Sequence, residues 1–274
     1  DVHLLVFHEG EDIAIPGVTI RRIANVPGVK NIPPGITWKK IVCDLFMLFS
    51  LFRLHRKHKY EVIHAVEESA FMAMVVKWIS GTPFIYDMDS SLDIQIVDKL
   101  RFLSPFRGFL EFFERKAVQS SCGVVAVCKA LEDIARAYAP DKKIVRLEDV
   151  SLLDDTVKSD EILRDNYNIS GPIMLYVGNL ESYQGIDLLL KSFQKVVSDD
   201  CTGNLVIIGG AEKDIVSYQQ MADQLGISEH TTFCGPRPVE LLGHFLAQAD
   251  ILLSPRIHGN NTPMKLYSYL DSGK

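Results

Sequence analysis

The sequence has no apolar run of membrane-spanning length, no excess of positive charge and no cysteine spacing typical of a metal site. A spanning helix needs about 18–20 consecutive apolar residues, and no run reaches that length. Lysine and arginine number 29 against 35 aspartate and glutamate, and the net charge of −6 argues against a nucleic-acid partner. The five cysteines are scattered, which favours reduced thiols in a cytoplasmic protein.

The length and composition are those of a globular protein with two domains. Hydrophobic residues make up 47% and charged residues 23% of the 274 positions. Domains of roughly 100–200 residues are typical, so the length indicates two of them. The chain begins at Asp1 without a methionine and ends at Gly273-Lys274, directly after a helical pattern. Since an α/β protein usually continues from such a glycine into a strand, we expect both ends to belong to a longer protein.

Apolar runs rich in valine and isoleucine alternate with longer amphipathic stretches, which predicts α/β domains with parallel sheets covered by helices. The lack of polar alternation in the runs indicates strands that are buried on both faces. Strands are expected at residues 3–7, 61–66, 83–88, 123–128, 173–178, 204–210, 231–235 and 250–255. Helices are expected at residues 38–58, 69–80, 93–121, 129–138, 184–199, 212–226, 238–248 and 264–272.

A polar, acidic stretch at residues 147–161 separates the two halves of this pattern. We therefore expect one domain over 1–155 and a second over 156–274. Ligands of open α/β sheets bind at the carboxyl ends of the strands, so the site is expected in the cleft between the halves.

Residues 38–59 combine an apolar block with basic residues and leave two interpretations open. One is an interfacial helix that makes a peripheral contact with an anionic membrane. The other, which we favour, is a crossover helix whose basic last turn complements the helix dipole. The basic residues of the segment are Lys39, Lys40, Arg53, Arg56, Lys57 and Lys59.

Two loops of the second half have features of phosphate-binding turns. Gly178 ends a predicted strand and Gly185 opens a helix, which would present free backbone N–H groups and a positive helix end. The last loop is followed by Thr262 as a candidate N-cap and by Pro263 in the first helical turn. Lys265 in that turn is unfavourable for the helix dipole, so we expect an anion beside it.

Several segments, in this order, resemble a family 4 glycosyltransferase. In the second half they are GNLESYQGIDLLLKSF, LVIIGG, TTFCGPRPVELLGHFLAQADILLSP and TPMKLYSYLDSGK. In the first half they are EVIHAVEESA, GTPFIYDMDSS and ERKAVQSSCGVVAVCKALEDI. The resemblance implies the GT-B fold, two Rossmann-like domains facing across a cleft, with a sugar nucleotide held by the second. It also implies retention of anomeric configuration and no essential metal. Judged against this family, the first strand with its glycine-rich loop and the last strand and helices are missing.

The chain departs from the family's donor site at several positions. The two cations that grip the donor diphosphate in the family are replaced by the uncharged Asn179 and Gln184. Two family glutamates, eight positions apart, correspond to Ser268 and to the neighbourhood of Asn260. Each lost charge-assisted contact costs ~1.5–3 kcal/mol, so the site is either rebuilt around other cations or inactive. We favour a rebuilt site, with these donor-binding residues: Gly178, Asn179, Gln184, Arg256, Gly259, Asn260, Asn261, Thr262, Lys265 and Ser268.

The first half is expected to hold the acceptor and the catalytic groups. His64 ends one predicted strand, and Asp87 and Asp89 end the next. A carboxylate at such a strand end can orient an acceptor hydroxyl or stabilise positive charge at an anomeric carbon. The structural alternatives are that His64 is a core histidine and that Asp89 caps a helix.

The resemblance thus implies a retaining, metal-independent hexosyltransferase that uses a nucleotide-sugar as co-substrate, without a further cofactor. We expect a saccharide or lipid-linked acceptor and a role in envelope or exopolysaccharide biosynthesis at the inner face of the membrane, an analogy with the family. The alternatives are a catalytically degenerate GT-B protein that serves as a partner subunit and, less favoured, a sugar-nucleotide epimerase.

Overall fold

The computed structural model describes residues 1–32, 37–91, 107–154, 156–199, 203–257, 259 and 261–274. The chain forms two compact units, Asp1–Leu147 and Glu148–Lys274. The division lies eight residues before the predicted boundary, because the acidic stretch packs on the second unit. There the backbone N–H of Leu152 donates to Ser268 Oγ (3.1 Å), and Leu153 packs against a buried apolar cluster.

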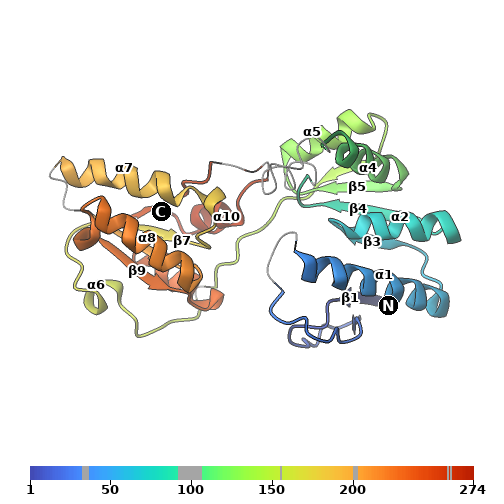
Figure 1. The fold of residues 1–274 in the computed structure, drawn as a ribbon, viewed down its shortest axis with the longest axis horizontal. Helices are drawn as coiled ribbons and strands as arrows, with labels where there is room; N and C mark the ends of the chain where they lie inside the picture. Colours follow the sequence, from blue (N-terminus) through green and yellow to red (C-terminus); the bar gives the residue numbers. More distant parts are fainter. Residues whose placement is uncertain (33–36, 92–106, 155, 200–202, 258, 260) are drawn as a thin grey trace. The chain divides into compact units, whose positions relative to one another are not determined.

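The first unit contains a parallel strand pair and a four-stranded parallel sheet of order β3-β4-β5-β6 (Figure 1). Its elements are β1 (Val2–Val6), β2 (Val18–Arg22), α1 (Trp38–His58), β3 (Ile63–Val66), α2 (Ser69–Ser80), β4 (Phe84–Met88), α4 (Arg107–Ser120), β5 (Gly123–Ala126), α5 (Lys129–Tyr138) and β6 (Ile144–Arg146). The strands β1 and β2 pair with each other in a separate sheet.

The second unit contains a four-stranded parallel sheet of order β10-β7-β8-β9. Its α-helices are α6 (Leu163–Asn166), α7 (Ile186–Ser198), α8 (Glu212–Gln224), α9 (Leu242–Ala247) and α10 (Met264–Asp271). Its strands are β7 (Ile173–Val177), β8 (Asn204–Ile208), β9 (Thr231–Gly235) and β10 (Ile251–Leu252). Short 3-10 turns are η2 (Ser182–Gln184), η3 (Ser228–His230) and η4 (Val239–Leu241).

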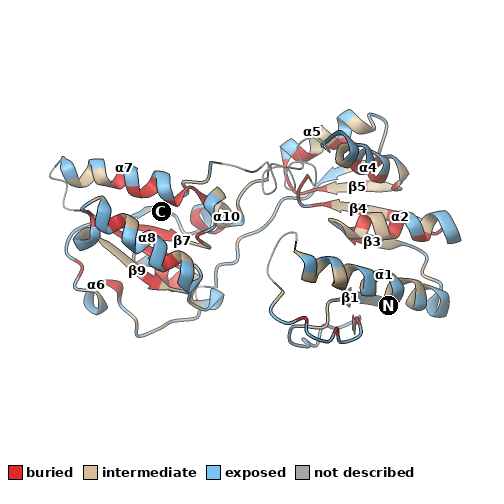
Figure 2. Cartoon of the chain, viewed as in Figure 1, coloured by how far each residue is buried: buried red, intermediate tan, exposed pale blue. Residues whose placement is uncertain are grey.

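The central strands of the second unit, β7 and β8, are buried on both faces, as their composition predicts. On β8, Leu205 and Ile207 join the apolar cluster of one sheet face, and Val206 and Ile208 join that of the other. Figure 2 shows this sheet as a buried layer between helices whose outer surfaces are exposed. The prediction of an α/β protein with parallel sheets is therefore confirmed.

Among the α-helices and strands of the described residues, β2, β6 and α6 were not predicted. The apolar alternation of β2 is masked by two arginines, one of which, Arg22, donates to the carbonyls of Phe7 (3.1 Å) and Glu9 (2.6 Å). The first part of the helix predicted at 93–121 lies outside the described residues. Over the described ranges, no helix is both long and apolar enough to cross a membrane.

Candidate functional site

The carboxyl ends of β7 and β8 approach each other so closely that only glycines fit. A Cβ built on Gly209 would lie 2.2 Å from the carbonyl oxygen of Gly178, and Gly209 has a φ of +110°. Both features exclude a side chain at this position. The strand ends therefore form a narrow, half-buried edge of glycine backbone, and ligands of parallel sheets bind at such edges.

A second close approach joins the loop after β7 to the loop after β10. A Cβ on Gly185 would lie 2.2 Å from the carbonyl oxygen of Pro255, and Gly185 has a φ of +76°. Gly185 precedes α7, so the start of this helix is held against the last loop. The two loops that the sequence analysis singled out thus lie together.

Lys265, in the first turn of α10, lies against the Gly178 turn. Its Nζ is 3.9 Å from the centre of the Tyr176 ring and donates to Gln184 Oε1 (3.2 Å). A Cβ on Gly178 would lie 2.7 Å from the same Nζ. The ammonium group is therefore held between an aromatic face, an amide oxygen and a glycine backbone.

The surroundings of Lys265 disfavour the positive charge of its ammonium group. Burial lowers the pKa of Lys265 to about 8, and the nearby Arg256 contributes in the same direction. An anionic ligand at this position would relieve both effects, because it would supply the negative charge that the surrounding protein lacks.

Arg256 is held by the loop that follows β10. Its Nη2 donates to Asn261 Oδ1 (2.7 Å), and its guanidinium lies 5.6 Å from the centre of the Tyr183 ring. A Cβ on Gly259 would lie 1.7 Å from Arg256 Nη2, and Gly259 has a φ of +112°, so a side chain at this position would be strained and would displace the guanidinium. Gly259 therefore helps to position the Arg256 guanidinium. Its predicted role in donor binding is a separate proposal.

The remaining predicted donor-site residues differ in where they lie. Asn179 donates through Nδ2 to Tyr183 Oη (3.3 Å), beside Arg256. Thr262 is half-buried, and the N-cap of α10 is Pro263 rather than Thr262, without a side-chain cap. Ser268 is 2% exposed, and its Oγ accepts a hydrogen bond from the backbone N–H of Leu152. Asn260 lies outside the described residues.

In the first unit, the predicted site residues His64 and Asp87 form a hydrogen bond between neighbouring strands. His64 was expected at the end of its strand, but it is the second residue of β3, and Asp87 is the fourth residue of β4. His64 Nε2 lies 2.7 Å from Asp87 Oδ2. The His64 side chain is 53% exposed, which rules out the alternative of a core histidine. Asp89 follows directly after β4, and the stretch it would cap lies outside the described residues.

A charged cluster beside this pair was not anticipated. Lys40 Nζ, from α1, contacts Glu68 Oε1 (2.5 Å) and Glu67 Oε2 (4.0 Å), both in the turn after β3. Ser90 Oγ donates to Glu67 Oε1 (3.0 Å). Burial and the nearby Glu68 raise the pKa of Asp44 to about 6. This edge is therefore rich in carboxylates, with one lysine already paired.

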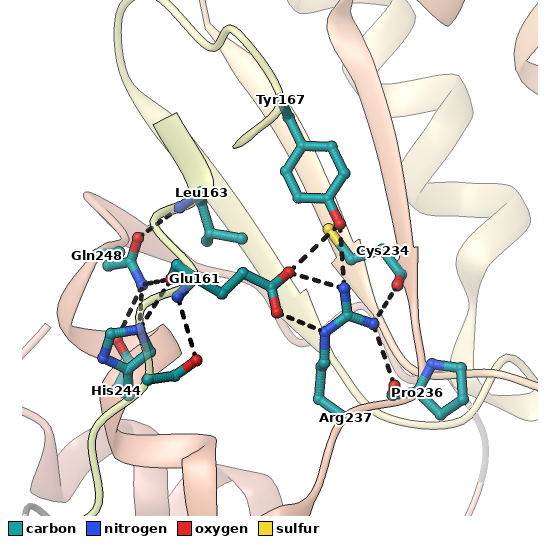
Figure 3. A network of polar contacts seen from close by, with 9 residues as sticks. Glu161, Leu163, Tyr167, Cys234, Pro236, Arg237, His244 and Gln248 are labelled. Carbon is teal, nitrogen blue, oxygen red and sulfur yellow. Dashed lines mark hydrogen bonds and ion pairs between the residues drawn. The ribbon is translucent and has the colours of Figure 1, made fainter. Parts of the chain in front are cut away.

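Figure 3 shows a second network that the sequence analysis missed, at the end of β9. Arg237 donates from Nε to Glu161 Oε2 (2.8 Å) and from Nη2 to Oε1 (2.7 Å), a bidentate ion pair. Its Nη2 also donates to Tyr167 Oη (3.1 Å), and its Nη1 donates to the carbonyls of Cys234 (2.5 Å) and Pro236 (3.2 Å). The guanidinium thus fixes the turn that leaves β9.

This network is anchored in turn on α9 and the residue that follows it. His244 Nε2 lies 2.9 Å from the Glu161 carbonyl oxygen, and Gln248 donates to the same oxygen (3.2 Å). The only signal in the sequence was an arginine between two prolines directly after a predicted strand. Among the described residues, no group of three or more His, Cys, Asp or Glu side chains is arranged to hold a metal ion.

The sequence of the second unit matches a known family. Residues 159–274 match the family described as Glycosyl transferases group 1. An 88-residue segment is 27% identical to D-inositol 3-phosphate glycosyltransferase of Corynebacterium diphtheriae, covering 30% of this chain and 21% of that protein. The match thus spans about a fifth of the relative.

Solved structures of glycosyltransferases share the fold. Sucrose-phosphate synthase from Thermosynechococcus elongatus aligns with a TM-score of 0.74 at 15% identity, over 96% of this chain and 68% of that one. Anabaena HepE in complex with UDP aligns with a TM-score of 0.66 at 14% identity, over 94% and 65%. WaaG, a glycosyltransferase involved in lipopolysaccharide biosynthesis, aligns with a TM-score of 0.64 at 14% identity, over 98% and 70%. The chain therefore has the Rossmann-like domains of the GT-B fold, and its residues 159–274 are similar in sequence to the group 1 glycosyl transferases.

Proposed function

We propose that the chain is a retaining, metal-independent glycosyltransferase that moves a hexosyl group from a nucleotide-sugar to a hydroxyl acceptor. The observation that carries this proposal is the placement of Lys265 against the Gly178 turn, beside Arg256, in a domain that matches the group 1 glycosyl transferases. Three aligned structures of HepE are complexes with UDP, with UDP and glucose, or with UDP-glucose, which supports a nucleotide-sugar donor.

The second unit would hold the donor diphosphate with a rebuilt pair of cations. Lys265 and Arg256 take over from the cations that Asn179 and Gln184 replace, and Gln184 Oε1 holds the lysine in position. A diphosphate would accept charge-assisted hydrogen bonds from both groups. The start of α10 beside Lys265 adds a positive helix end.

The first unit would hold the acceptor near His64 and Asp87. With Nε2–H donated to Asp87, the imidazole keeps Nδ1 as an acceptor for the proton of a sugar hydroxyl. Asp87 would then orient the ring, and Asp89 would stabilise positive charge at the anomeric carbon.

The acceptor would be a saccharide or a lipid-linked saccharide in envelope or exopolysaccharide assembly at the cytoplasmic face of the membrane. The similarity in fold to WaaG, which is involved in lipopolysaccharide biosynthesis, supports this setting.

A donor-binding panel tests the proposal. The chain is titrated calorimetrically with UDP-, GDP-, ADP-, CMP- and dTDP-sugars, and saturable binding of one of them is expected. The variant Lys265→Gln should weaken that binding about 10- to 100-fold, the loss of one charge-assisted contact. The matched control is Lys191→Gln, an exposed lysine on α7, which should leave binding unchanged. Equal binding by the wild type and by Lys265→Gln would contradict the assignment of the donor site.

The uncharged residues Asn179, Gln184 and Ser268 favour a second candidate, a degenerate transferase that acts as a partner subunit. This candidate predicts one of two outcomes. Either the chain binds no sugar nucleotide, or it binds one but releases no nucleoside diphosphate within hours when a saccharide acceptor is added. Measurable release of the diphosphate would exclude it.

A further inference from the structure

The helix α1 exposes a continuous stripe of large apolar side chains. Trp38 is 64% exposed, Ile41 and Leu45 are each 54% exposed, and Phe49 is 73% exposed. Their spacing of three, four and four residues places them on one face of the helix. Scattered apolar residues are common on protein surfaces, but a stripe of this length on one helix marks an interaction surface.

The opposite face of α1 already belongs to the core of the first unit. Cys43 is fully buried in an apolar cluster with Ile23 and Val29, and Met47 packs against this cluster. The interpretation of α1 as a helix that covers the core therefore accounts for one face only. The second apolar face needs another explanation.

The exposed face changes from apolar to cationic along the helix. Arg53 and Arg56 are exposed and follow Phe49 at spacings of four and three residues, on the same face. The one carboxylate of the helix, Asp44, lies away from this face, near Lys40 and Glu68. This local excess of positive charge occurs in a chain with a net charge of −6.

We propose that α1 docks the protein on an anionic lipid bilayer, with Trp38, Ile41, Leu45 and Phe49 inserted at the boundary of headgroups and acyl chains. Arg53 and Arg56 contact the lipid phosphates. Interfacial helices combine an apolar face with cationic residues in this way, and tryptophan is enriched at membrane interfaces. The helix lies on the membrane and does not cross it.

The neighbouring helix α2 also exposes a large aromatic side chain. Lys40 of α1 contacts Glu68 at the start of α2, and His55 Nε2 of α1 lies 3.0 Å from Thr82 Oγ1 beyond its end, so the two helices run alongside each other. On α2, Trp78 is 86% exposed.

Charge favours a bilayer over a second copy of the chain as the occupant of this face. A two-fold contact would place the arginines of two copies in one interface, because such contacts use the same surface twice. The exposed face of α1 offers no carboxylate to pair with them. Anionic lipid supplies that negative charge.

Vesicle flotation with the 274-residue chain tests the proposal. Vesicles of phosphatidylcholine mixed with phosphatidylglycerol should bind on the order of 100-fold more tightly than vesicles of phosphatidylcholine alone, because several cations face the surface. Phe49→Glu should abolish flotation, and Arg53→Gln with Arg56→Gln should remove the preference for anionic lipid. The matched control is Leu188→Glu on α7, where Leu188 is 48% exposed, and it should float like the wild type.

The two tryptophans of the chain provide a second readout. In the variant Trp78→Phe, the remaining Trp38 emission should shift to the blue on anionic vesicles and be quenched by brominated lipid. Flotation that Phe49→Glu does not change, an absence of flotation, or a dimer in solution that Phe49→Glu converts to a monomer would each overturn the proposal. The donor-binding panel is independent of these results, since Phe49→Glu should leave nucleotide-sugar affinity unchanged.

Discussion

Each unit places a half-buried lysine at the carboxyl edge of its parallel sheet, and the two lysines have opposite surroundings. Burial disfavours the charge of Lys40, but the hydrogen bond and the negative charge of Glu68 outweigh it, so the pKa of Lys40 is raised. Lys265 is buried beside Arg256, and its pKa falls to about 8. Over the described residues, no carboxylate lies within ion-pair distance of Lys265.

This difference indicates which ligand each edge can accept. The lysine of the first unit is neutralised within the protein, and the surrounding carboxylates would repel an anion. The lysine of the second unit lacks a negative partner, so an anionic ligand gains most there. Two sheets of similar topology thus provide similar positions, and a few side chains decide their chemistry.

The largest expected effect comes from a substitution in the glycine backbone at the carboxyl ends of β7 and β8. Gly209→Ala should lower the free energy of unfolding by about 3 kcal/mol, because the new Cβ meets the Gly178 carbonyl and φ is positive. The matched control is Gly226→Ala, which also has a positive φ but no atom within 4 Å of the added Cβ. It should cost only about 1 kcal/mol. Urea denaturation measures the free energy of unfolding of both variants. Equal losses of stability would show that the close approach of Gly209 to Gly178 does not contribute to the effect.

The second prediction concerns the ion pair that holds the end of β9. Arg237 keeps the pKa of Glu161 below its ordinary value of 4.5. The stabilisation is therefore complete above pH 4.5 and is lost as the pH falls through the lowered pKa. Arg237→Met should cost about 2 kcal/mol at pH 7, since it leaves a largely buried carboxylate without its partner.

Denaturation curves between pH 3 and pH 7 check this expectation. The difference between the wild type and Arg237→Met should shrink as the pH falls below 4.5 and through the lowered pKa of Glu161, because protonation of the carboxylate removes the ion pair. The variant Arg115→Met removes an exposed pair on α4 and serves as the control, with a loss of at most about 1 kcal/mol. A difference that stays constant with pH would contradict the role given to Glu161.

How much of this could be predicted from the sequence depends on the distance between partners. The Gly178 turn and Lys265 could be named as candidate site residues because strand ends, glycines and helix starts are patterns that a short stretch of sequence contains. The pairs Lys40–Glu68 and Arg237–Glu161 were missed because 28 and 76 residues separate their members. Periodicity also left α1 undecided, since both of its faces are apolar and only the fold shows which one is buried.

The third prediction sharpens the contrast between the lysines. If a sugar diphosphate binds beside Lys265, its affinity should fall by up to about tenfold per unit as the pH rises above 8, because the free enzyme then loses the charge that the ligand needs. Lys265→Arg stays charged and should flatten this dependence. Calorimetry between pH 7 and pH 9.5 measures it, and a flat profile for the wild type would place the diphosphate elsewhere.

The smallest expected effect concerns the acidic cluster of the first unit, where the charge of Asp44 lowers the free energy of unfolding. The pKa of Asp44 is raised to about 6, first by burial and then by Glu68. The folded state therefore binds more protons than the unfolded state between about pH 4 and pH 6, so stability falls as the pH rises through this range, and the loss of stability stays constant above it.

Asp44→Asn should stabilise the protein by about 1 kcal/mol at pH 7, and the gain should vanish below pH 4. Asp133→Asn, at an exposed site on α5, should give no such gain. If Asp44→Asn destabilised the protein at pH 7, the carboxylate would be a favourable partner of Lys40, and the first edge would be balanced in charge rather than acidic.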